Sequence, residues 1–240
     1  MKLYVYCVAE DIDVLEDLPL GISGAPVRLL KTKDISVLVS DLDADVVQVT
    51  RENALAHATV VRSILARTTP LPFRFGTLVT EQQLTSYLSA RKPALEARLA
   101  EVRGCIEMSV KIIWESSGQE PKPQPGDPDN QGAGASFLLQ KRREILGGER
   151  SAADAAAIST WLHEKVSGLI RDEQVTLRPS QRLVLAASHL VERSKIRQYR
   201  EKVAEIRQDR LDLHFLVSGP WPPYSFANIE LEFKSQFGVS

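Results

Sequence analysis

The sequence predicts an α+β protein with two α+β domains followed by a C-terminal tail. Strand-like apolar runs are interspersed with stretches in which apolar residues recur at helical spacing. From residue 104 to 219 the expected elements follow the order βαββαβ, the ferredoxin-like split βαβ pattern. We therefore expect an N-terminal α+β domain over 1–103, a ferredoxin-like domain over 104–219, and a proline- and aromatic-rich arm and tail over 220–240.

The first fifty residues read as a strand followed by a hairpin. Residues 2–9 are rich in tyrosine and valine, which favour strands. Two short apolar runs, 26–30 and 35–40, flank a polar turn and predict a β-hairpin. Apolar residues then recur at helical spacing over 50–67, which predicts an amphipathic helix.

An extended segment separates this helix from the next one. The X-Pro bonds of Thr69-Pro-Leu-Pro disfavour helix. Thr80 and Gln83 match a capping box, and the helix that they open should be kinked or divided at Pro93. Gly104 is expected to end it.

The second domain should begin with a strand over 105–114, where apolar and polar residues alternate, so that one face is core and the other carries polar side chains. Residues 115–135 contain no bulky apolar side chain and predict a mobile loop. A proline-rich partner motif is the less favoured interpretation, because no clean P-x-x-P frame is present. The remaining expected elements are helices over 137–146 and from 151, strands over 174–177 and 182–192, a helix over 194–210 and a strand over 211–217.

Composition limits the classes of function. The chain has 240 residues and a net charge of -1, whereas a general nucleic-acid or anionic-membrane binder usually has a strong basic excess. No stretch is long and apolar enough for a transmembrane helix, and the N-terminus does not resemble a signal peptide. Cys7 and Cys105 lie in apolar runs and are expected to be reduced core residues. These features predict a cytoplasmic protein that binds neither nucleic acid nor membrane.

No catalytic constellation is apparent. The four histidines are scattered singly, and no cysteine–histidine cluster or nucleophile motif occurs. His57 stands alone on its helix, so a packing role is favoured over a catalytic one. We therefore expect no catalytic, cofactor-binding or metal-binding residues.

Two unusual motifs stand out. One is Pro70-Leu-Pro-Phe-Arg-Phe-Gly-Thr77, and the other is Gly219-Pro-Trp-Pro-Pro-Tyr-Ser-Phe226. Three prolines make the second motif stiff and extended, and its aromatic side chains would be costly to leave in water. Together the motifs resemble those of the GvpL/GvpF family of gas vesicle proteins, and the resemblance spans nearly the whole chain.

The resemblance implies an accessory or minor structural protein of gas vesicles, the gas-filled protein shells that give some prokaryotes buoyancy. It would assist shell assembly by binding the major shell protein GvpA and other gas vesicle proteins. It would be no enzyme and would need no cofactor or small-molecule substrate. The interaction residues expected from the two motifs are Pro72, Phe73, Arg74, Phe75, Gly76, Trp221, Pro222, Pro223, Tyr224 and Phe226.

Two hypotheses describe how the aromatic arm acts. It could fold back over the Phe73–Phe75 region and expose an apolar patch when released, or it could serve only as a structural staple. A different class of function, a ferredoxin-like small-ligand-binding protein or enzyme, would need a polar pocket, for which Arg74, His57 and Glu107 are the candidate residues.

Overall fold

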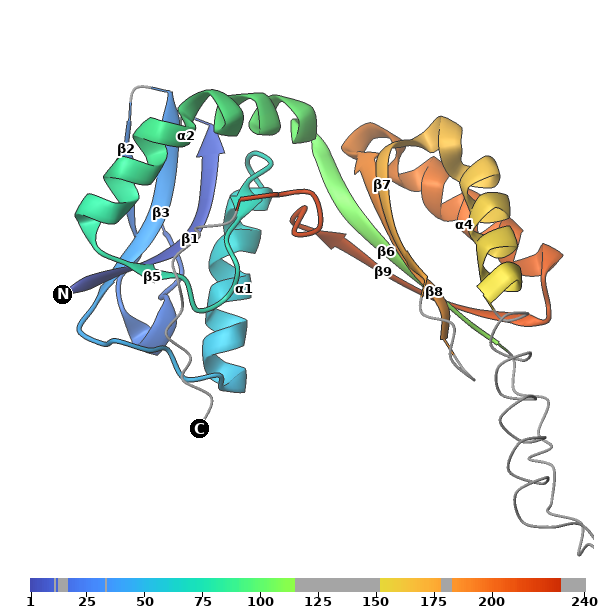
Figure 1. Ribbon diagram of the computed structural model, residues 1–240, viewed down its shortest axis with the longest axis horizontal. Coiled ribbons are helices and arrows are strands. Elements are labelled where there is room, and N and C mark those ends of the chain that lie inside the picture. The colour runs from blue at the N-terminus through green and yellow to red at the C-terminus, as the bar shows by residue number, and fades with distance from the viewer. Residues whose placement is uncertain (11, 13–16, 33, 115–151, 178–182, 230–240) are drawn as a thin grey trace, which may run out of the picture. The chain divides into compact units, whose positions relative to one another are not determined.

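The computed structural model describes residues 1–10, 12, 17–32, 34–114, 152–177 and 183–229 (Figure 1). The predicted mobile loop, the predicted helix over 137–146 and the last eleven residues lie outside these ranges. The chain divides into two compact units, residues 1–107 with 220–240, and residues 108–219. The domain boundaries predicted from the sequence stay a prediction, and each unit is described by itself.

Unit 1 is built on a five-stranded sheet with the order β2-β3-β1-β4, in which β5 also pairs with β1. β1 pairs antiparallel with β3, β4 and β5, and β2 with β3, so the predicted hairpin is confirmed. The elements of this unit are β1 (Lys2–Glu10), the short 3₁₀ helix η1 (Ile22–Gly24), β2 (Arg28–Lys31), β3 (Ile35–Leu42), α1 (Arg51–Leu65), β4 (Leu71–Pro72), β5 (Leu78–Val79) and α2 (Glu81–Val102).

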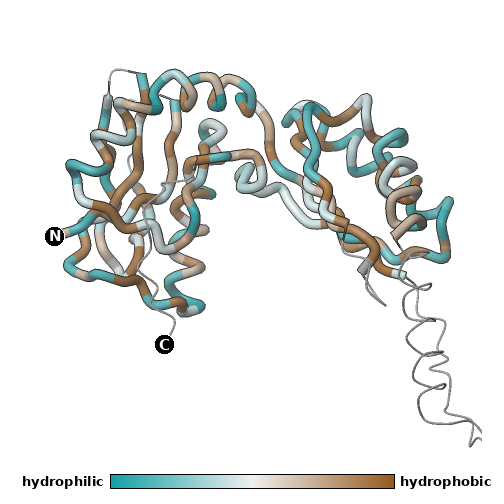
Figure 2. The backbone as a smooth tube through the Cα atoms, in the orientation of Figure 1, coloured by the Kyte–Doolittle hydropathy of each residue, from teal (hydrophilic) through white to brown (hydrophobic). Residues whose placement is uncertain are grey.

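β1 is the centre of this unit. Every residue from Leu3 to Ala9 is buried, and both α1 and α2 contact the strand. The core contains Tyr4 and Tyr6 with Val60, Val61 and Ile64 of α1. Hydrophobic stretches follow β1 and β3, whereas hydrophilic residues are interspersed along the helices and loops (Figure 2). A strand buried on both faces explains why its sequence is a nearly continuous apolar run.

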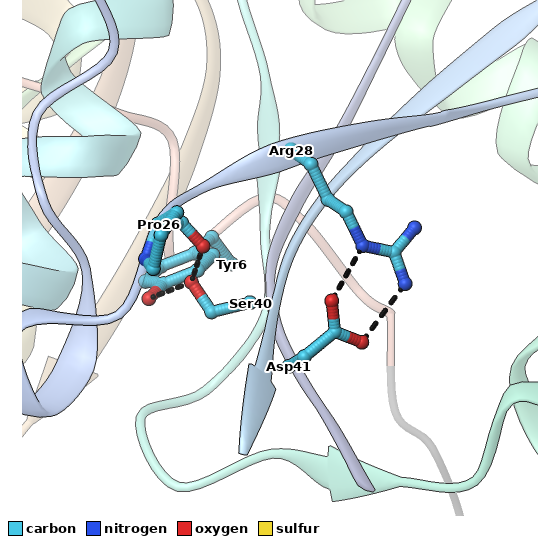
Figure 3. Close-up of polar contacts among 5 residues, drawn as sticks. All are labelled: Tyr6, Pro26, Arg28, Ser40 and Asp41. Carbon is cyan, nitrogen blue, oxygen red and sulfur yellow. Dashed lines mark hydrogen bonds and ion pairs between the residues drawn. The ribbon is translucent and has the colours of Figure 1, made fainter. Parts of the chain in front are cut away.

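A polar network ties the hairpin to β1 (Figure 3). The Tyr6 hydroxyl lies 3.0 Å from Ser40 Oγ, which donates to the Pro26 carbonyl at 2.9 Å. The Tyr6 hydroxyl also accepts the Ile22 N–H at 2.9 Å. Next to this network, the Arg28 guanidinium on β2 donates two hydrogen bonds to the Asp41 carboxylate on β3, with N–O distances of 2.8 and 3.0 Å. These bonds fix the β2–β3 hairpin and the preceding turn against the central strand.

α2 opens with the predicted capping box, since Thr80 and Gln83 exchange both hydrogen bonds. Of the two expected effects of Pro93, a kink or a division, the division does not occur, because α2 runs unbroken through that residue. Pro93 is exposed. The carbonyl that loses its helical donor there can therefore face water, which lowers the cost of an internal proline.

Unit 2 contains a four-stranded sheet with the order β7-β8-β6-β9, in which β7 and β8 pair antiparallel. The α+β class is confirmed, whereas the ferredoxin-like assignment stays a prediction. β7 begins four residues earlier than expected. The elements are β6 (Cys105–Trp114), a helix over 152–166, η2 (Ser167–Leu169), β7 (Ile170–Leu177), β8 (Leu183–Glu192), η3 (Arg193–Lys195), α4 (Ile196–Asp209) and β9 (Leu213–Trp221).

Candidate functional site

The first motif forms a tight turn between two short strands that both pair with β1. Phe73 N–H donates to the Tyr6 carbonyl at 2.9 Å, and Val5 N–H donates to the Thr77 carbonyl at 3.0 Å. Thr77 closes the turn by donating its N–H and its hydroxyl to the Arg74 carbonyl. Gly76 has φ +89°, which a residue with a side chain adopts only with strain. We call residues 73–77 the FRFGT turn.

The second motif begins on β9 and continues as a compact turn in unit 1. β9 includes Trp221. Tyr224 N–H donates to the Pro222 carbonyl at 2.7 Å, and Phe226 N–H donates to the Pro223 carbonyl at 3.1 Å. We call residues 220–229 the arm. The φ angles of its three prolines are fixed, which reduces the conformational entropy that the arm loses in adopting this shape.

A carboxylate and a guanidinium anchor the arm. Glu107, which is only 6% exposed, accepts the Ser225 N–H at 2.8 Å and the Ser225 hydroxyl at 2.7 Å. Arg98 of α2 donates to the Phe226 carbonyl. Hydrogen bonds to charged groups are stronger than neutral ones. Glu107 belongs to the face of its strand that was expected to carry polar side chains, and there the arm covers it.

α1 supplies the aromatic contacts of the arm. The Arg62 guanidinium lies 5.3 Å from the centroid of the Trp221 ring, a cation–π arrangement. The rings of His57 and Tyr224 are 6.3 Å apart, and those of His57 and Phe75 are 5.9 Å apart. His57 therefore contacts both motifs, which are separated by more than a hundred residues in the sequence.

His57 is held from the side of β1 by tyrosines. The Tyr4 hydroxyl lies 2.9 Å from His57 Nδ1, and the Tyr6 ring stacks on the imidazole. The Gly76 N–H donates to the same Tyr4 oxygen at 3.2 Å. The buried Nε2 atom of His57 has no hydrogen-bond partner among the residues that the structure describes.

Burial controls the titration of this cluster. Loss of hydration lowers the pKa of His57 to about 4, and the nearby Phe73 carbonyl opposes this shift only in part. Burial also raises the pKa of Tyr4, although the Gly76 N–H counteracts it. At neutral pH the imidazole and the phenol are therefore both uncharged.

The ten residues expected from the motifs differ in exposure. Arg74 and Gly76 are exposed, Trp221 and Tyr224 are 37% and 41% exposed, and Phe75 is intermediate. The buried members are Pro72, Phe73, Pro222, Pro223 and Phe226. The structure brings the rings of Phe75 and Tyr224 both to His57, whereas the Phe73 ring packs on Tyr87 of α2 at 6.2 Å.

Sequence reasoning did not find the residues that hold the motifs together. No contact with either motif was predicted for Tyr4, and Arg62 and Arg98 were not singled out at all. Each lies on a regular strand or helix, where its residue type is common. Only their position in three dimensions marks them as partners of the arm.

A groove of about 610 Å³ lies between α2 and the end of the arm. The residues suggested for a small-ligand pocket do not line it. His57 and Glu107 are buried and bonded as described above, and Arg74 is exposed. The groove is lined by Tyr87, Arg91, Ala94, Leu95, Arg98, Glu101, Ala227, Asn228 and Ile229.

Unit 2 holds a second buried histidine. His189 Nδ1 lies 2.6 Å from the Tyr199 hydroxyl, and its Nε2 lies 3.7 Å from Glu173, which pairs with His163. Loss of hydration lowers the pKa of His189 to about 4, and His163 adds to this shift. Across the described part of the chain, no three acidic, histidine or cysteine side chains are arranged to hold a metal ion.

Comparison with known proteins gives consistent results over both units. The family model described as gas vesicle synthesis protein GvpL/GvpF matches residues 2–228. The chain is 28% identical to gas vesicle protein L2 of Halobacterium salinarum, covering 93% of this chain and 90% of that protein. It is also 28% identical to gas vesicle protein L of a Streptomyces species, covering 95% and 94%.

Solved structures show the same fold. The crystal structure of gas vesicle protein GvpF from an Anabaena species matches with a TM-score of 0.75 and 20% identity, covering 95% of this chain and 97% of that one. The GvpF structure from Microcystis aeruginosa matches with a TM-score of 0.72 and 19% identity, covering 95% and 99%.

Proposed function

Because this chain belongs to the gas vesicle synthesis protein GvpL/GvpF family, we propose that it supports gas vesicle assembly by binding the major shell protein GvpA and other gas vesicle proteins. The observation that carries the proposal is the extent of the family match. It covers both units and almost all of the arm, so the whole architecture is shared rather than one common domain.

We assign partner contact to the exposed residues of the two motifs. Arg74, Trp221 and Tyr224 offer a guanidinium and two large amphipathic rings, which are the side-chain types enriched in binding hot spots. The five buried motif residues serve to shape the turn and the arm. This division separates residues that bind a partner from residues that present the binding surface.

The proposed role is non-enzymatic and lies at the gas vesicle. The relatives are named as gas vesicle proteins, which supports this role. Among the described helices none is long and apolar enough to cross a membrane.

Complementation in a gas-vesicle-forming host tests the proposal. The gene is deleted and replaced by the wild type or by a Trp221→Ala/Tyr224→Ala variant, and vesicles are counted by electron microscopy. Vesicles should be lost or malformed in the deletion and in the variant. Normal vesicles in the deletion strain would overturn the proposed role.

A pull-down then tests the partner. Tagged wild-type protein should retain GvpA, and the double variant should retain several-fold less at equal folded concentration. A Leu211→Ala variant is the matched control, because Leu211 is an exposed apolar residue of unit 2 outside both motifs. If wild type and double variant retained equal amounts of GvpA, the assignment of the binding surface would be wrong, but the proposed role in vesicle assembly would stand.

A further inference from the structure

His57 occupies a closed cage that the arm completes. Tyr4 and Tyr6 form one side, Phe75 of the FRFGT turn another, and Tyr224 of the arm a third. The histidine is only 4% exposed. Hydration of its ring therefore requires one of these walls to move.

The hydrogen bonds leave one nitrogen of the His57 ring unpaired. Nδ1 lies 2.9 Å from the Tyr4 hydroxyl, whose oxygen also accepts the Gly76 N–H. Nε2 has no hydrogen-bond partner among the described residues. In the protonated ring both nitrogens are donors, so one buried N–H would lack an acceptor while the cage stays closed.

Apart from the Phe73 carbonyl, which favours the charged ring, the surroundings offer little to stabilise an imidazolium ion. The titratable groups facing the ring are the phenols of Tyr4 and Tyr6 from β1 and of Tyr224 from the arm. Arg62 and Glu107 act on the Tyr224 phenol with opposite sign, and Cys7 is a neutral thiol. No carboxylate of a described residue hydrogen-bonds to His57. A buried charge without such a partner is costly.

The arm is the wall that yields most easily. Tyr4 and Tyr6 lie in the central strand, and the FRFGT turn is held by β4 and β5 on either side. Tyr224 lies outside helix and strand and is 41% exposed. Moving it breaks the Ser225–Glu107 contacts and leaves the sheet intact.

We infer that His57 is a proton-responsive latch. Protonation of His57 releases the arm from unit 1 and exposes the rings of His57 and Phe75, which contact each other. The inference concerns regulation of the surface proposed above for partner binding. The latch is tested on the protein alone, so its failure would not bear on GvpA binding, and failure of GvpA binding would not bear on the latch.

The test is amide hydrogen exchange of the full chain between pH 7.5 and pH 3.0, a range that extends below the His57 pKa of about 4, corrected for the intrinsic effect of pH. Peptides covering residues 222–229 should lose protection at least tenfold as the pH falls, while peptides from β1 keep theirs. NMR titration of the His57 ring in the same protein should give the same midpoint. The inference would be overturned if the arm lost protection at a different pH from the His57 titration, or if the arm stayed protected throughout.

Variants separate His57 from the other groups. His57→Gln should abolish the pH-dependent step, and His163→Gln, which alters an exposed histidine of unit 2, should preserve it. Glu107→Gln should loosen the arm at every pH but retain the step. A step that disappears in Glu107→Gln and persists in His57→Gln would assign the effect to the carboxylate and refute the latch. If His57→Gln does not fold, the inference is still tested in the wild type, by comparing the pH midpoint of arm exchange with that of the His57 titration.

Discussion

The carboxylate of Glu107 accepts both the backbone N–H and the hydroxyl of Ser225, across 118 positions of sequence. This pair joins the start of β6 to the arm. The carboxylate is nearly buried, so its hydrogen bonds substitute for the water that it has lost. The pair therefore defines the docked position of the arm.

Ser225→Ala should destabilise the arm through Glu107. The variant removes one donor to a buried carboxylate, and we expect unit 1 to lose about 1–3 kcal/mol in urea unfolding. Ser167→Ala is the control, because the Ser167 hydroxyl is exposed and donates only a long hydrogen bond, of 3.4 Å, to a backbone carbonyl. Equal stability of both variants would show that the Ser225 hydroxyl does not hold the arm.

Substitutions of Phe226 and of Trp221 should have different effects, the first mainly on stability and the second mainly on GvpA binding. Phe226 is fully buried, so Phe226→Leu should cost about 1–2 kcal/mol through imperfect packing. Trp221→Ala removes a partly exposed ring and should cost less stability while reducing GvpA capture. Thermal unfolding and pull-down measured on both variants check this. The reverse ranking in stability would contradict the assigned roles.

Gly21 should tolerate no side chain. A Cβ atom there would lie 1.9 Å from the Tyr6 hydroxyl oxygen and 2.8 Å from Ser40 Oγ, so Gly21→Ala must disrupt the network of Figure 3. We expect a loss of about 1–3 kcal/mol. Gly168→Ala is the matched control, since nothing lies within 4 Å of its added Cβ. Similar melting temperatures for the two variants would refute the prediction.

His189 should make unit 2 less stable in acid. Its pKa is about 4 in the folded state, against 6.5 ordinarily, so between these values the unfolded chain binds more protons. The free energy of unfolding that depends on neutral His189 is fully present above pH 6.5 and is lost as the pH falls toward 4. The loss amounts to about 3 kcal/mol.

Urea unfolding at several pH values measures this slope. His189→Gln should flatten it between pH 6.5 and 4, whereas His163→Gln, next to the same Glu173, should change it less. The groups facing His189 are Tyr199 from α4, Glu173 from β7 and His163 from the helix over 152–166. An unchanged slope in His189→Gln would contradict the expected burial effect.

Local patterns predicted much of the fold. The continuous apolar run of β1, the capping box at Thr80 and the β2–β3 hairpin were all apparent, because each depends on residues close in sequence. Pro93 does not divide α2, because an exposed proline disturbs a helix less than a buried one. The extra length of β7 arises from pairing with β8, a long-range contact that no local pattern shows.

The sequence by itself determined the α+β class, the rare composition of the two motifs and, through them, the resemblance to a family. Only the tertiary structure decided that the FRFGT turn and the arm meet at His57, and that Glu107 is buried beneath Ser225. The reason is physical. Propensity and periodicity act over a few residues, whereas the burial of a histidine or a carboxylate depends on which distant segment covers it.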